Sequence, residues 1–380
     1  MHVKELLEQI PDETLDFLAA QTGADYKVKK LSGKVFFKLF LSSLLREDRN
    51  SLRVMEQIFS SYQFQHMAGL EPGSSIAHSS ISDRFNSIKP AFFEELFKDC
   101  VQRFSKYFPE DDQLLLFDST HVSVSAKLID IGLKINQAKG DKRQLKFTMG
   151  LSSIPVHGKV FTQQQYASEN LALAEAIREA SQSKERIVVF DRGLQSRPVL
   201  EGFTKEQIWF VTRLNGNARI EVIEEFEVPE QDQQEQDQLI IEQDISVRLF
   251  NQKRQPTTSF LRLIIALSPI DGQQFRFLTN IKDLEPQRIA QIYKKRWDIE
   301  VFFKFLKQHL NFSHTTARSL NGIKVTLYAT MILAILLTVY KRLNNMKGYK
   351  IPKLRFSLQL DELLIKQAGI VYAGMPNPPI

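Results

Sequence analysis

Two aspartates stand at places in the sequence where carboxylate chemistry can be arranged. Asp118 directly follows the apolar run LLLF, and Asp191 directly follows the apolar run IVVF. An acid at the end of a buried strand lies at the edge of a sheet, where groups from neighbouring strands converge on a ligand. Two carboxylates that meet there repel each other unless a proton or a cation lies between them. The pair therefore predicts a site that holds a proton or a cation, although each aspartate alone is also typical of a residue that caps a turn.

A third acid, Glu300, lies in the segment QIYKKRWDIEVFFKFLKQHL, where we expect one continuous helix from about residue 285 to residue 310. Four polar side chains form one stripe along the border of its apolar face: Tyr293, Arg296, Glu300 and Lys307. That place favours partly buried functional groups. The alternative is a surface ladder of ion pairs, such as Glu300 with Lys304, which stabilises a helix by only ~0.3 kcal/mol per pair.

The spacing of this stripe resembles the signature of a known enzyme family. It fits the pattern Y-x2-R-x3-E-x6-K without a gap. That pattern is the signature of the insertion-sequence-four (IS-4) family of DDE transposases. Upstream, FDST at 117–120 and VVFDRG at 188–193 resemble the two aspartate motifs of the family, in the same order. The resemblance spans roughly residues 113–340.

The resemblance implies an α/β fold, namely a ribonuclease H-like mixed-sheet catalytic core with a β-rich insertion, flanked by helical N-terminal and C-terminal regions. It implies that DNA strands are cut and joined at three residues that are both catalytic and metal-binding: Asp118, Asp191 and Glu300. Two Mg²⁺ or Mn²⁺ ions per active site suit this chemistry, because they screen the charge between the attacking and leaving oxygens. Asp118 is expected to bridge the two ions, with Asp191 and Glu300 each completing the ligands of one.

The DNA contacts are assigned to side chains beside the acids. Arg296 and Lys307 are expected to hold phosphates next to the scissile bond, and Tyr293 to donate a further hydrogen bond. Lys146, on a strand expected near the site, is another candidate for a phosphate contact. The expected partners are the terminal inverted repeats of a transposon, target DNA and a second copy of the chain. A homodimer in the DNA complex is expected because two ends must be processed and joined to one target.

The sequence departs from the family pattern at two places. Leu194 follows the DRG element, where many relatives have a tyrosine. The expected insertion contains no tryptophan, since the two tryptophans of the chain are Trp209 and Trp297. Some relatives use a tryptophan there to hold a flipped base while a DNA hairpin forms, so a hairpin intermediate is left open here. The phenylalanines of the insertion, Phe226 and Phe260 among them, are predicted to be core residues.

The secondary structure that must position these residues is expected to change from helices to strands along the chain. The first 108 residues have mostly helical periodicity, and from residue 113 the runs become strand-like, rich in branched and aromatic side chains. We therefore predict a helical DNA-end-binding domain at 1–108 and a catalytic core at 109–214 plus 281–314. A β-rich insertion at 215–280 separates the two parts of the core. A helical, basic C-terminal region follows at 315–380.

The charge of the chain is unevenly distributed. The formal net charge is +6, yet residues 221–245 contain ten acidic side chains and no Lys or Arg. Because 50 basic residues then face 34 acidic ones, the remainder carries a formal charge of +16. Such an excess favours salt-dependent binding to DNA phosphates, although a solvated basic surface would give the same count. The candidate cations of the N-terminal helices are Lys27, Lys29, Lys30, Lys34, Lys38, Arg46, Arg49, Arg53 and Arg84.

Cysteine content and the length of the apolar segments indicate the cellular compartment of the protein. The single cysteine excludes a disulfide within one chain and a cysteine-based zinc site, which suits a reducing cytoplasm. The N-terminal segment MHVKELLEQIPDETL has no apolar signal-peptide core. The longest apolar run, Val325–Tyr340, has 16 residues, fewer than the roughly 20 that a membrane span needs. We therefore predict a buried helix, no membrane partner, and a cytoplasmic, nucleoid-associated protein of a bacterium or archaeon.

Two other functions are compatible with the sequence. A ribonuclease H-like nuclease that cuts without joining would carry the same carboxylates, but the helix signature favours transposition. An inactive or repurposed transposase acting as a sequence-specific DNA-binding protein is the second alternative. The presence of all three acids argues against it, and a metal-dependent cleavage assay separates it from the enzyme.

Overall fold

The chain forms two compact units. The computed structural model describes residues 2–46, 51–109, 113–124, 132–134, 143–182, 186–228, 238–251, 253–312, 317 and 319–373. The first unit comprises Met1–Pro109, His121–Leu145 and Phe303–Ile380, and the second comprises Glu110–Thr120 and Lys146–Phe302. Strands β1 (Leu114–Ser123) and β3 (Arg143–Leu151) and helix α11 (Trp297–His309) each contribute residues to both units.

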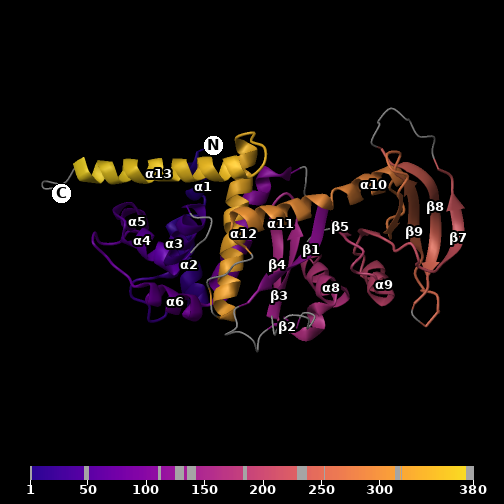
Figure 1. The fold of residues 1–380 in the computed structure, drawn as a ribbon, viewed down its shortest axis with the longest axis horizontal. Helices are drawn as coiled ribbons and strands as arrows, with labels where there is room; N and C mark the ends of the chain where they lie inside the picture. The colour runs from indigo at the N-terminus through magenta and orange to yellow at the C-terminus, as the bar shows by residue number, and fades with distance from the viewer. Residues whose placement is uncertain are drawn as a thin grey trace. The chain divides into compact units, whose positions relative to one another are not determined.

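The first unit is helical and joins segments from both ends of the chain (Figure 1). Its helices are α1 Val3–Leu7, α2 Asp12–Thr22, α3 Gly33–Arg46, α4 Leu52–Ser60, α5 Tyr62–Ala68, α6 His78–Ser87, α7 Pro90–Phe104, η1 Ser105–Tyr107, α12 Leu320–Leu343 and α13 Lys350–Ala373. Helix α12 packs against α7, α6 and α3, and α13 packs against α5, α3 and α1. Serine hydroxyls cap several of these helices: Ser51 accepts from the Val54 N–H, Ser61 from the Phe64 N–H and Ser319 from the Gly322 N–H.

Helix α12 is apolar around its whole circumference. By length and composition alone it could cross a membrane, but 89% of its most apolar window is buried inside the fold. A helix that is hydrophobic on every side requires packing partners on every side, and α3, α6 and α7 supply them here. The prediction that the run Val325–Tyr340 is a buried helix is therefore confirmed.

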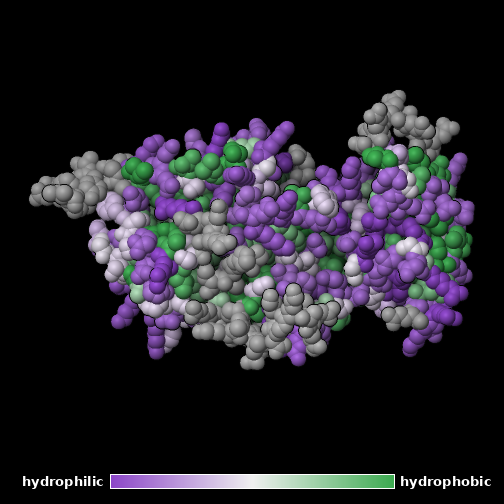
Figure 2. All heavy atoms as spheres, in the orientation of Figure 1, coloured by the Kyte–Doolittle hydropathy of each residue, from purple (hydrophilic) through white to green (hydrophobic). Residues whose placement is uncertain are grey.

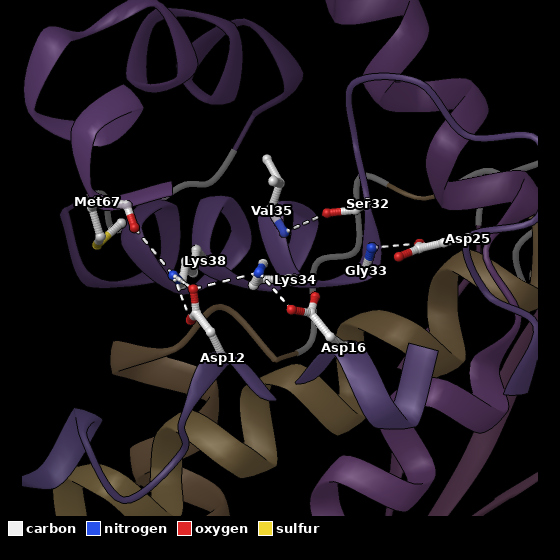
Figure 3. A network of polar contacts seen from close by, with 9 residues as sticks. All are labelled: Asp12, Asp16, Asp25, Ser32, Gly33, Lys34, Val35, Lys38 and Met67. Atoms are coloured by element: carbon white, nitrogen blue, oxygen red, sulfur yellow. Dashed lines mark hydrogen bonds and ion pairs between the residues drawn. The ribbon is translucent and has the colours of Figure 1, made fainter. Parts of the chain in front are cut away.

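A network of ion pairs ties α2 to α3 in the first unit (Figure 3). The Lys34 ammonium lies 2.8 Å from Asp16 Oδ2 and 3.5 Å from Asp12 Oδ2. The Lys38 ammonium lies 2.7 Å from Asp12 Oδ1 and donates to the Met67 carbonyl at 3.1 Å. These two lysines therefore have their charges offset within the unit.

The described strands form one ten-stranded mixed sheet, in the order β2-β3-β1-β5-β6-β10-β9-β8-β7, with β4 paired to β3. The remaining bounds are β2 Leu133–Lys134, β4 Pro155–Phe161, β5 Ile187–Phe190, β6 Phe210–Arg213, β7 Ile220–Phe226, β8 Ile240–Leu249, β9 Leu261–Leu267 and β10 Gln274–Thr279. At its centre β1 pairs with β5 and β5 with β6, both in parallel. The antiparallel strands β3 and β4 lie to one side.

Helices α8 (Glu169–Ala180) and α9 (Arg197–Lys205) contribute to the core of the second unit. Leu173 and Phe203 from these helices join Phe117 and Phe190 of the central strands in one buried cluster. Wholly apolar runs such as IVVF are expected in parallel strands, because both of their faces are covered. The predicted class, a ribonuclease H-like mixed sheet with helices packed on it, is confirmed.

The strands between residues 215 and 280 extend the same sheet. Strand β10 pairs antiparallel with β6, and β9, β8 and β7 follow as curved antiparallel neighbours (Figure 1). Phe277 on β10 is buried, but Phe226 is 40% exposed and Phe260 is 50% exposed. The prediction that the last two are core residues is wrong, because Phe226 ends the edge strand of the sheet and Phe260 precedes β9 in a loop.

Candidate active site

The strand register brings the two predicted aspartates to neighbouring positions. The parallel pairing of β1 with β5 ends with Phe117 beside Phe190. The next residue on each segment is an aspartate, Asp118 and Asp191. Asp191 directly follows the last residue of β5, whereas β1 continues past Asp118 to Ser123. The strand continues because it has a second neighbour, β3, on its other side.

The segment that carries Glu300 is two helices. Helix α10 (Pro286–Lys294) ends before α11 (Trp297–His309) begins, and between them the Arg296 N–H donates to the Tyr293 carbonyl at 2.9 Å. A hydrogen bond to the third preceding residue tightens the backbone relative to an α-helix. The expectation of one continuous helix is therefore wrong, and the polar stripe is interrupted at Arg296.

Three members of the stripe nevertheless contact an aspartate or one another. The Tyr293 hydroxyl donates to Asp191 Oδ1 at 3.0 Å. Arg296 Nη1 lies 2.6 Å from Glu300 Oε1, and the guanidinium carbon lies 5.7 Å from the centre of the Tyr293 ring. The ion-pair partner of Glu300 is thus Arg296, where the surface-ladder alternative had named Lys304. With Arg296 only 13% exposed, this pair is not a solvated ladder.

Asp118 lies in an environment that disfavours its charge. Burial raises the pKa of Asp118 to about 6, from an ordinary value of 3.8. The Ser119 N–H, which donates to Asp118 Oδ1 at 2.7 Å, and the Arg296 guanidinium lower that pKa, whereas the Glu169 and Glu300 carboxylates raise it. Charges influence one another to this degree only when they are close. Asp118, Arg296 and the two glutamates therefore form one electrostatic cluster.

The groups around Asp191 are held in defined protonation states. Burial, followed by the charge of Asp191, raises the pKa of Tyr293, so the phenol keeps its proton and donates it in a hydrogen bond. Burial alone would lower the pKa of Arg296, but the hydrogen bond to Glu300 and the nearby negative charges raise it. The buried Arg296 Nε has no hydrogen-bond partner among the described residues.

The sequence analysis missed a polar layer behind Asp118. Glu169, the first residue of α8, accepts from Ser119 Oγ at 3.0 Å and from Lys146 Nζ at 2.8 Å. Ser119 Oγ also lies 2.9 Å from Thr148 Oγ1. The signal that was available is a lysine inside the apolar strand QLKFTMG, because a fully buried lysine requires a charged partner.

Two of the predicted phosphate contacts lie in different surroundings. Lys146 is fully buried, and its ammonium also donates to the Ala167 carbonyl at 2.8 Å. A contact with DNA would require that ammonium to leave its pair with Glu169. Lys307 lies near the end of α11, in the part of that helix that belongs to the first unit, with its ammonium 5.8 Å from the centre of the Phe303 ring. Its phosphate contact stays a prediction.

The donor set fits a hard divalent cation. Carboxylate oxygens are the ligands that Mg²⁺ and Mn²⁺ prefer, and Asp118, Asp191 and Glu300 supply them. Burial raises the pKa of Asp118, and the Glu169 and Glu300 carboxylates add to that effect, which Arg296 offsets only in part. Within the described ranges, however, no three Asp, Glu, His or Cys side chains are gathered closely enough to hold one metal ion. Asp118, Asp191 and Glu300 therefore lie in one region of the second unit, but their carboxylates do not converge on a single point.

Comparisons with known proteins give a consistent result. The chain is similar to "Putative transposase y4zB" of Sinorhizobium fredii, with 28% identity over 190 residues, which is 50% of this chain and 51% of the relative. It is also similar to "Putative transposase for insertion sequence element IS4SA" of Synechocystis, with 36% identity over 105 residues, covering 26% of this chain and 28% of the relative. "Probable transposase for insertion sequence element IS5377" of Geobacillus stearothermophilus is 31% identical over 74 residues, covering 20% of each chain.

The family assignment rests on a longer match. The chain spans about half the length of the first of these relatives and less of the other two. A family model described as the transposase DDE domain matches residues 109–337, more than half of the chain and including all three predicted acids. The chain therefore belongs to the transposase DDE domain family.

Proposed function

We propose that the chain is a DNA transposase of an insertion sequence, which cuts transposon ends and joins them to target DNA by metal-dependent phosphoryl transfer. One observation carries this proposal. In a chain of the transposase DDE domain family, Asp118 and Asp191 each follow the last pair of the parallel β1–β5 register, and Tyr293 and Arg296 link Asp191 to Glu300. The names of the relatives, two of which specify insertion sequence elements, support the same function.

In this proposal Asp118, Asp191 and Glu300 would hold two Mg²⁺ or Mn²⁺ ions. When bound, two such ions supply an activated oxygen nucleophile and screen the charge of the phosphodiester. The hydrogen bond from Tyr293 orients the Asp191 carboxylate, and the Ser119 N–H orients that of Asp118. Arg296 offsets the charge of Glu300 and is a candidate to hold a phosphate beside the scissile bond.

The proposal is tested with the intact chain and the DNA that flanks its gene, sequenced for inverted repeats. In Mg²⁺ we expect cleavage at the repeat ends, followed by joining of the released 3′ ends to a target plasmid, and no product with EDTA. Binding to the ends without cleavage in Mg²⁺ or Mn²⁺ would favour the DNA-binding alternative. Cleavage without joining would favour a nuclease.

The candidate phosphate contacts between α10 and α11 and on α11 make a quantitative prediction. Arg296→Ala and Lys307→Ala should each weaken DNA-end binding and flatten the log–log salt dependence of the binding constant by about one unit, because each removes one phosphate contact. Fluorescence anisotropy between about 50 and 200 mM salt measures these slopes. Lys304→Ala, an exposed cation on the same helix, serves as the matched control. If the salt-dependence slopes of both variants equal that of the Lys304 control, Arg296 and Lys307 have a structural role and do not contact phosphates.

We propose that the N-terminal helices recognise the transposon ends. Arg46 pairs with Asp361 at 2.6 Å and Arg84 pairs with Asp25 at 2.8 Å, so these cations, like Lys34 and Lys38, have internal partners. Arg49 lies outside the described residues. The candidates without a carboxylate partner in the described chain are Lys27, Lys29, Lys30 and Arg53. Point substitutions suit this question better than deletion of residues 1–108, because deletion would expose the apolar surface of α12.

We also propose that the active form is a homodimer assembled on two DNA ends. Helix α13 exposes an apolar stripe at heptad-like spacing: Ile351, Leu354, Leu358 and Ile365, each 50–60% exposed. Figure 2 shows apolar patches along this helix. Exposed Arg355 and Glu362 flank the stripe, and an antiparallel pairing centred between Leu358 and Gln359 would set Arg355 against the partner's Glu362. Four side chains fall short of the ~800 Å² per partner that a stable interface buries, so DNA must supply part of the association energy.

A mixing experiment tests whether the two subunits cut in trans. A Glu300→Ala subunit is combined with a subunit that carries intact acids but is defective in end binding. Neither protein alone should cleave, because one lacks a metal ligand and the other does not reach the end. The mixture should regain cleavage if each end is cut by the subunit bound to the other end. No recovery, with both proteins folded and assembled on DNA, would rule out the crossed arrangement.

We place the protein in the cytoplasm of a bacterium or archaeon, at the nucleoid. This proposal follows from its DNA substrate, and the burial of α12 supports it because the one described helix that is apolar enough to span a membrane is packed inside the first unit.

A further inference from the structure

A lysine occupies the interior of strand β3 where an apolar residue would pack at lower cost. The strand is RQLKFTMGL, and Lys146 is fully buried between buried Leu145 and Phe147. Taking an ammonium out of water costs several kcal/mol even when it is paired. A buried ion pair is often no more stable than apolar residues of the same volume. Stability alone therefore does not account for this lysine.

The ammonium of Lys146 holds one end of Glu169. Lys146 Nζ donates to Glu169 Oε1 at 2.8 Å and to the Ala167 carbonyl at 2.8 Å. Glu169 begins α8, and the positive end of a helix dipole favours an acid in the first turn. Its side chain is 30% exposed, so the glutamate reaches from the buried lysine toward the surface of the site.

The other oxygen of Glu169 is connected to Asp118 through Ser119. Ser119 Oγ donates to Glu169 Oε2 at 3.0 Å and lies 2.9 Å from Thr148 Oγ1. The N–H of the same serine donates to Asp118 Oδ1 at 2.7 Å. The Ser119 side chain is held from two sides, which restrains the segment whose N–H binds Asp118. One oxygen of Asp118 is engaged in this way, and the second has no hydrogen-bond partner among the described residues.

We infer that the pair of buried Lys146 and partly exposed Glu169 positions the Asp118 carboxylate through Ser119 and thereby sets the affinity of the site for a divalent cation. This inference rests on the proposed function. Lys146 and Glu169 are positioning residues, since they act through Ser119. Partners that orient a metal ligand typically contribute about 10–100-fold to metal affinity.

The test is calorimetric titration of Mn²⁺ into the intact, DNA-free chain. We expect Glu169→Gln to weaken Mn²⁺ binding by about 10–100-fold and Ser119→Ala by about tenfold. Ser119→Thr keeps the hydroxyl and should restore near wild-type affinity, which a merely structural role would not predict. Glu175→Gln is the matched control, because Glu175 lies on the same helix and pairs with a strand lysine, Lys159, at 2.7 Å. It should leave the affinity unchanged.

A double variant separates positioning from folding. Lys146→Met with Glu169→Leu replaces the buried pair by apolar side chains and should fold, yet bind Mn²⁺ at least tenfold more weakly. Wild-type affinity in this folded variant, or in both Glu169→Gln and Ser119→Ala, would overturn the inference. If the wild type bound Mn²⁺ no more tightly than Asp118→Ala, the proposed metal site itself would be wrong. If only Asp118→Ala lost Mn²⁺ affinity and the positioning variants kept it, the metal site would stand and the positioning role would be wrong.

Discussion

Alanine at Asp118, Asp191 or Glu300 is expected to lower the rate of DNA-end cleavage in Mg²⁺ by about a thousandfold or more. Metal-ion stabilisation of developing charge contributes several kcal/mol, and each 1.36 kcal/mol corresponds to about a factor of ten in rate. Binding of the same DNA should change by no more than about twofold, because phosphate contacts elsewhere supply the affinity. Single-turnover cleavage and a binding assay on the same preparations measure both effects.

Asp298→Ala is the matched control for this experiment. Asp298 lies in the first turn of α11, two residues before Glu300, and is exposed to solvent. Its removal changes the charge by the same amount and should leave cleavage within about twofold of wild type. If any of the three site variants still cut near the wild-type rate, that residue is not a metal ligand.

Asp118→Asn is expected to stabilise the metal-free protein at pH 8 by about 2–3 kcal/mol. The folded pKa of Asp118, about 6, is higher than its ordinary value of 3.8. Above pH 6 the wild type must therefore keep a buried carboxylate ionised, at a cost in folding free energy, whereas asparagine is always neutral. Below about pH 4 the aspartate is protonated in both the folded and unfolded states, so the cost disappears.

The stability difference should consequently grow as the pH rises from about 4 to 6 and stay constant above that. Urea unfolding of both proteins at pH 4.5 and pH 8, in EDTA, measures it. Mg²⁺ should narrow the gap at pH 8, because a bound cation offsets the carboxylate charge in the wild type. Equal stability of the two proteins at pH 8 without metal would show that Asp118 is not held in a charge-disfavouring site.

Much of the central sheet could be predicted because its strands are continuous apolar runs. LLLF and IVVF indicated β1 and β5, and branched and aromatic residues indicated β8, β9 and β10. Strand β7 was missed because its sequence, IEVIEEF, lies in the acidic stretch and has no buried face. An edge strand that is exposed on both faces carries no alternation of polar and apolar residues, so periodicity cannot reveal it.

The site shows a similar limit. Tyr293 and Arg296 could be selected from spacing within one segment, and both contact site residues in the structure. The pairing of Lys146 with Glu169 could not be predicted from spacing, because it joins a strand to the start of a helix 23 residues later. Such a contact depends on how α8 packs against the sheet. The break before α11 was also invisible, since it is a change in hydrogen bonding rather than in the apolar pattern.

The first unit has a consequence for how the protein is made. The N–H of Val3 is hydrogen-bonded to the side chain of Gln359, 356 residues away, and α12 packs among helices formed from the first 104 residues. At a synthesis rate of about 5–20 residues per second, the early helices wait roughly 20–70 s for these partners. Residues 146–302 of the second unit are contiguous and can fold during that interval. A nascent chain therefore exposes the apolar faces of α3 and α7 to chaperones until α12 and α13 have been synthesised, and the arrival of these two helices becomes the step that completes the helical unit.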